Sequence, residues 1–78
     1  SKCYVLPDVH GGKVAAMLMD VSVRFARDTG ARCVWLGVNQ ENQRAQRFYR
    51  KHGFEVSGTK TFQLGERTES DYVLVRLL

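Results

Sequence analysis

The sequence lacks the features of several special protein classes. It has a single proline, and its longest apolar run, residues 14–19, is far shorter than the roughly 20 residues that span a bilayer. The first residues do not form a signal peptide, so we expect no membrane partner. The two cysteines and two histidines show no zinc-site spacing. The sequence therefore predicts no metal site and indicates a reducing, cytoplasmic compartment.

The composition of the 78 residues is that of one small globular domain. Apolar residues make up 44% and charged residues 26%, which excludes a disordered or collagen-like chain. A net charge of +4 favours anionic partners without choosing among them. The chain begins with serine and enters a strand pattern at once, which suggests a fragment or a processed product.

The first half of the sequence predicts a strand, a helix and a second strand. Residues 3–6 form a β-branched and aromatic run that Pro7 ends. A helix is expected from Lys13 to Asp28, capped near Gly30. Its expected buried face consists of Val14, Met17, Leu18, Val21 and Phe25. Residues 33–38 form a continuous apolar run, typical of a buried parallel strand, and complete a β-α-β unit.

The second half predicts a helix and a hairpin. Residues 39–42 offer helix caps, and Gly53 ends the helix. The apolar face of this helix consists of Ala45, Phe48, Tyr49 and His52. Residues 54–62 and 70–78 read as antiparallel strands joined by a loop at residues 63–67. The predicted fold is therefore an α/β domain with a mixed sheet, in the order β-α-β-α-β-β.

Glycines between the first strand and the first helix form a candidate anion site. Unpaired backbone N–H groups and the helix dipole favour a phosphate there, and Lys13 adds a charge. The spacing matches neither a Walker loop nor a dinucleotide fingerprint, so an ordinary tight turn remains the alternative.

Two stretches of the sequence together resemble the GNAT family of N-acetyltransferases. Residues 5–7 and the glycine turn resemble the family's first motif, with His10 in place of Arg or Gln and Lys13 in place of the middle glycine. The family's second motif is matched by Asn42, Ala45, Tyr49, Gly53 and Phe54. The resemblance covers essentially the whole chain, but only the C-terminal half of a family domain.

The resemblance implies an acetyl-CoA site and transfer of the acetyl group to an amine of unknown identity. Main-chain groups of Val5 would bond the pantetheine arm, where the first strand separates from its parallel neighbour. The pyrophosphate would be held by His10, Gly11, Gly12, Lys13, Val14 and Ala15. Asn42 would bond the pantetheine or nearby backbone, Phe48 would pack along the arm, and Tyr49 would protonate the departing CoA thiolate.

Other interpretations stay open. Tyr49, at helical spacing from Ala45, is also typical of a core aromatic residue. The two cysteines could lie close together on adjacent parallel strands, but they are expected to be buried structural thiols without a chemical role. The basic stripe of Arg44, Arg47 and Lys51 is more simply a solvated face than a nucleic-acid site. A non-catalytic remnant that binds CoA or dimerises is a further alternative. Because half of a family domain is absent, we expect a homo-oligomer or a tightly held N-terminal segment.

Overall fold

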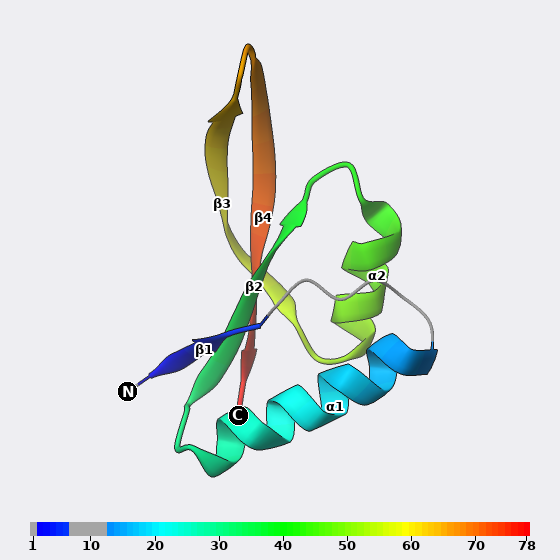
Figure 1. Cartoon of the computed structure of the whole chain (residues 1–78), viewed down its shortest axis with the longest axis vertical. Helices are drawn as coiled ribbons and strands as arrows, with labels where there is room; N and C mark the ends of the chain where they lie inside the picture. The colour runs from blue at the N-terminus through cyan, green and yellow to red at the C-terminus, as the bar shows by residue number, and fades with distance from the viewer. Residues whose placement is uncertain (1, 7–12) are drawn as a thin grey trace.

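The computed structural model describes residues 2–6 and 13–78, so the predicted turn at residues 10–12 lies outside the described part. Six elements follow one another in the predicted order (Figure 1). They are β1 (Cys3–Val5), α1 (Lys13–Asp28), β2 (Cys33–Asn39), α2 (Gln43–Lys51), β3 (Glu55–Leu64) and β4 (Arg67–Leu77).

The four strands form one mixed sheet in the order β1-β2-β4-β3. β1 runs parallel to β2, and the β2–β4 and β3–β4 pairs are antiparallel. The predicted α/β class, parallel pair and hairpin are therefore confirmed. The prediction of α1 over Lys13–Asp28 is also correct to the residue.

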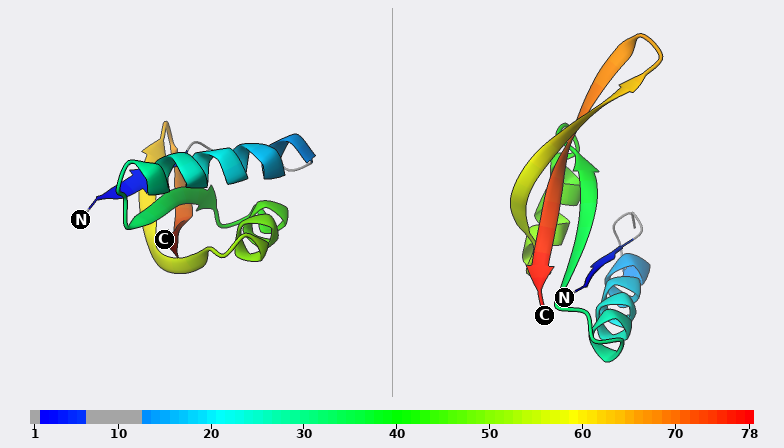
Figure 2. Two further views of the ribbon diagram at one scale, coloured as in Figure 1. Left: turned by 90° about the horizontal axis from the view of Figure 1, so that it is seen from below. Right: turned by 90° about the vertical axis from the view of Figure 1, so that its left-hand side faces the viewer.

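The hairpin is longer than the sequence predicted. Its strands pair as far as Leu64 and Arg67, which leaves only Gly65 and Glu66 as the turn. Gly65 has a φ of 62°, the left-handed conformation that a two-residue hairpin turn requires. The predicted five-residue loop was wrong because this tight turn lets the ladder continue. Figure 2 shows the tip projecting beyond the rest of the sheet.

The core lies on one face of the sheet. Residues opposite each other in the β2–β4 register point to the same side, which places Val34, Leu36 and Leu74 together on that face. Residues of both helices join these strand residues in one buried cluster. It consists of Leu6, Met19, Val23, Ala26, Ala31, Val34, Leu36, Val38, Tyr49, Phe54 and Leu74. Both helices therefore pack against the same face.

The rotation of α1 differs from the sequence prediction. The described members of its predicted buried face are all exposed, namely Met17, Leu18, Val21 and Phe25. The residues that are buried instead are Ala15, Met19, Val23 and Ala26. Two alanines on this inner face present little volume and allow the helix to approach closely. The more hydrophobic stripe thus faces away from the core and is available to another surface.

The two cysteines lie side by side on the parallel pair. Cys3 and Cys33 are register partners, their Cα atoms are 4.5 Å apart, and their sulfur atoms form a disulfide. From the sequence we expected two buried thiols that could lie close together; the structure instead links them, and Cys3 is exposed. The parallel register explains the difference, because it brings together cysteines that are 30 residues apart in the chain.

Candidate functional site

The end of β1 is the first part of the candidate site. The backbone N–H of Leu6 donates to the carbonyl oxygen of Trp35 at 2.9 Å, so β1 and β2 stay paired as far as Leu6. Pro7 has no N–H and cannot extend this ladder as a donor. The separation expected from the sequence at Val5 is therefore not present in the described residues, because Val5 pairs with Trp35 and Leu6 continues the ladder. The side chain of Val5 is 55% exposed.

The N-terminus of α1 is the second part. The first backbone N–H groups of a helix have no partner within it, and α1 has no acidic side chain in its first turn. The amides of Lys13, Val14 and Ala15 therefore lie where a helix favours an anion. Ala15 is buried, as expected for a small residue at close packing. The predicted contacts at His10, Gly11 and Gly12 fall outside the described residues.

The start of α2 is the third part. The Oδ1 atom of Asn42 accepts a hydrogen bond of 3.1 Å from the Ala45 N–H and caps the helix. Just before it, the Oδ1 of Asn39 accepts from the Glu41 N–H at 2.9 Å. Asn42 is exposed, so its side chain can be reached from solvent. The sequence analysis gave Asn42 two possible partners, the pantetheine or nearby backbone. The structure shows a bond to backbone.

Tyr49 lies on the inner face of α2 with an exposed fraction of 0%. Its ring makes edge contacts with Phe48 and Phe54, at centroid distances of 5.3 Å and 5.8 Å. Phe48 is half-buried and also contacts the ring of His52 at 4.6 Å. Phe48 and Tyr49 are consecutive residues that the sequence analysis selected, and both belong to one aromatic cluster with His52 and Phe54.

Both ends of α2 are tied to the sheet by side chains that the sequence analysis did not select. Gln46 donates through Nε2 to the carbonyl oxygens of Asn39 at 3.2 Å and Gln40 at 2.9 Å. Arg76, on β4, donates through Nη1 to the carbonyl oxygen of His52 at 2.9 Å. Gln46 could have been found from the sequence, because a polar residue three positions before Tyr49 lies next to it on a helix. Arg76 comes from 24 residues beyond His52, and no local pattern identifies it.

The basic stripe of α2 is a solvated face in the structure. Arg44, Arg47 and Lys51 are all exposed. Within the described residues they form no ion pair, and the pair that is present there joins Arg67 to Glu69 on the hairpin at 3.4 Å.

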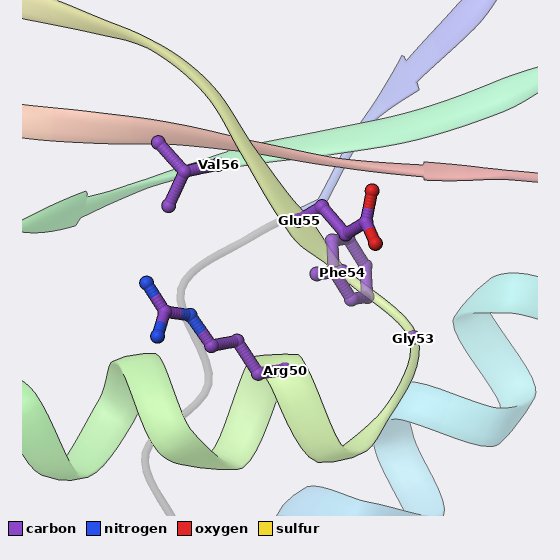
Figure 3. A pocket seen from close by; sticks show the side chains of 5 residues that line it. All are labelled: Arg50, Gly53, Phe54, Glu55 and Val56. Atoms are coloured by element: carbon purple, nitrogen blue, oxygen red, sulfur yellow. The ribbon is translucent and has the colours of Figure 1, made fainter.

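A separate hollow lies between α2 and β3. It has a volume of about 410 Å³ and is lined by Arg50, Gly53, Phe54, Glu55 and Val56. Figure 3 shows the Arg50 and Val56 side chains on one side of it, with the Glu55 carboxylate turned away from the guanidinium. Of the five lining residues, none was predicted to bind a ligand.

Neither a metal cluster nor a membrane span occurs in the described part of the chain. No group of three or more His, Cys, Asp or Glu side chains is positioned there to hold a metal ion. Neither of the two described helices has the length and apolar character needed to cross a bilayer.

Comparisons with known proteins agree with this architecture. The family model of the acetyltransferase (GNAT) family matches residues 1–54. An uncharacterized N-acetyltransferase of Mycobacterium bovis is 59% identical over 78 residues, which is 100% of this chain and 50% of that protein. The chain therefore belongs to the GNAT family, and it spans about half the length of the curated relatives it matches.

Two solved structures share the fold. A GNAT family acetyltransferase from Streptococcus pneumoniae has a TM-score of 0.73 and 24% identity, covering 87% of this chain and 43% of that one. A GNAT family acetyltransferase from Elizabethkingia anophelis, solved with acetyl-CoA bound, has a TM-score of 0.73 and 11% identity. That match covers 88% of this chain and 52% of the other.

Proposed function

We propose that this chain is the acetyl-CoA-binding half of an N-acetyltransferase. The observation that carries the proposal is the placement of two helix starts. α1 follows the carboxyl end of β1, and α2 follows the carboxyl end of its parallel neighbour β2. The carboxyl ends of parallel strands lie at the same edge of a sheet, which is where α/β folds bind ligands. The Elizabethkingia neighbour with bound acetyl-CoA and the family membership support acetyl-CoA as the ligand.

The residues at this edge suit an anionic, elongated ligand. The pyrophosphate would lie against the turn from His10 to Ala15, held mainly by backbone N–H groups, with Lys13 adding a charge. The absence of acidic side chains from the first turn of α1 fits an anion there. Main-chain groups of Val5 would bond the pantetheine arm. Asn42 and Phe48 would contact the arm from α2.

The proposed reaction is direct attack by an amine on the thioester. The amine nitrogen forms a bond to the carbonyl carbon, and the bond from that carbon to sulfur breaks, releasing CoA. Tyr49 would donate its phenolic proton to the departing thiolate. The amine attacks in its neutral form, the proton that its nitrogen sheds after attack passes to solvent, and the Tyr49 phenolate takes a proton back from solvent.

We also propose that the exposed side of α1 and β1 is covered in the working protein. β1 is an edge strand, and the exposed stripe of α1 lies beside it, since the rings of Tyr4 and Phe25 meet at 5.7 Å. A second copy or an N-terminal segment would cover this surface and help to build the amine site.

Binding of CoA measured by calorimetry tests the proposed ligand site. Replacing Gly11 by Val should weaken CoA binding more than Lys13→Ala, because a β-branched side chain blocks approach to the main chain. Lys13→Ala should lower the affinity modestly and reduce its salt dependence, since it removes one charge. A Lys13→Ala variant that loses more affinity than Gly11→Val would contradict a site built from backbone groups.

A further inference from the structure

We infer that Arg76 and Gln46 are positioning residues that hold the Tyr49 hydroxyl in place for the CoA sulfur. The inference rests on the proposed function, because it assigns these residues a role in the same site. Neither belongs to the motifs by which the sequence resembles its family. Arg76 reaches the end of α2 from β4, and Gln46 reaches from α2 to the end of β2, so each ties the helix to a strand of the sheet.

Arg76 fixes the C-terminal end of α2. Its guanidinium donates to the carbonyl oxygen of His52, one of the helix-end carbonyls that lack a partner within the helix. Gly53 adopts a φ of 91°, and a Cβ placed there would lie 3.4 Å from the Cδ and Nε atoms of Arg76. The arginine side chain therefore packs over the glycine as well as bonding the carbonyl. These contacts fix the helix end three residues beyond Tyr49.

Gln46 fixes the other side of Tyr49, three residues before it. Its amide bonds two consecutive carbonyl oxygens where β2 ends, and the side chain is partly buried. Gln46 and Tyr49 are neighbours on the helix surface, because positions three apart lie one turn from each other. Tyr49 is thus held between two attachments, one to the end of β2 and one to β4.

The attachments matter because α2 has only nine residues. A helix this short has little stability of its own, so packing and its end contacts set its position. A hydrogen bond to a thiolate depends steeply on distance and angle. A small shift of α2 would therefore weaken a bond from Tyr49 to sulfur while leaving the tyrosine in the core.

The pKa of the thiol of bound CoA measures this bond directly. A donor aimed at the thiolate lowers that pKa, and the thiolate can be followed by its ultraviolet absorbance. The two cysteines of this chain add no thiolate absorbance, because Cys3 and Cys33 are paired in a disulfide. Tyr49→Phe should raise the pKa of bound CoA by about one, which is a tenfold loss of thiolate well below the pKa. Arg76→Met keeps the aliphatic stem and should give about half of that rise.

Matched variants separate positioning from a direct effect of charge. Arg67→Met, which removes an exposed arginine at the hairpin, should leave the pKa of bound CoA unchanged. In a Tyr49→Phe background, Arg76→Met should have no further effect, because its action passes through the hydroxyl. If Arg76→Met does not fold, Gln46→Met tests the other attachment with the same expected rise.

Three results would overturn the inference. If the pKa of bound CoA in folded Arg76→Met equals that in the unmodified protein, while Tyr49→Phe raises it, Arg76 does not position Tyr49. The proposed function would then still stand. An equal effect of Arg76→Met with and without the tyrosine hydroxyl would show that the arginine acts by its charge. Absence of CoA binding by the unmodified protein would overturn the proposed function and this inference with it.

Discussion

Replacing Tyr49 by phenylalanine removes only the proposed acid. An ordinary phenol has a pKa near 10 and a thiol one near 8.5, so proton donation to a free thiolate is uphill by roughly 1.5 pKa units, or about 2 kcal/mol. Thiolate is already a fair leaving group, so the benefit of the acid should lie near the low end of the roughly 10² to 10⁴ range. We expect kcat to fall about ten- to a hundredfold.

The packing around Tyr49 indicates that Tyr49→Phe should leave acetyl-CoA binding nearly unchanged. The ring is fully buried against Phe48 and Phe54, and phenylalanine keeps both ring contacts. We therefore expect the KM for acetyl-CoA to stay within roughly threefold.

The assay follows release of CoA from acetyl-CoA by the protein at its natural length, with amino acids, polyamines and lysine peptides as acceptors. Thermal unfolding of the same variant controls for loss of core packing. An unchanged kcat would make Tyr49 a packing residue, and a large rise in KM at constant kcat would make it a cofactor anchor.

Two further predictions follow from the exposed stripe of α1. In a Val21→Glu background, which should keep the chain monomeric, Met19→Ala should destabilise it by about 2 to 5 kcal/mol, because Met19 is only 2% exposed. In the same background Met17→Ala, at a 69% exposed position, should change the free energy of unfolding by less than about 0.5 kcal/mol. Equal effects in thermal or urea unfolding would contradict the observed rotation of α1. Sedimentation at micromolar concentration should show a dimer or larger species, and Val21→Glu should dissociate it. A stable monomer that binds no hydrophobic dye would contradict the proposal that another surface covers the exposed stripe of α1.

The sequence was sufficient for features set by local chemistry. Asn42 and Gly53 mark the ends of α2 because a side-chain cap and a left-handed glycine act within a few residues. The parallel β1–β2 pair followed from a buried apolar run after a helix. The family resemblance also selected Phe48 and Tyr49, which follow each other in the chain and whose rings make an edge contact at 5.3 Å.

Features that depend on contacts between distant parts of the chain could not be predicted from the local sequence. Periodicity located α1 but favoured its larger apolar residues, and the sheet instead packs against Ala15 and Ala26. Arg76 reaches the end of α2 only because β4 lies beside β2 in the sheet. The bond between Cys3 and Cys33 likewise depends on strand register.

Hydrogen exchange with and without CoA tests the central proposal most directly, because it locates the ligand on the chain. We expect slower exchange at the first amides of α1 and around the start of α2 when CoA is added, with exchange at the hairpin tip at Gly65 unchanged. CoA binding with protection confined to the hairpin, or a folded chain whose exchange does not respond to CoA, would contradict it.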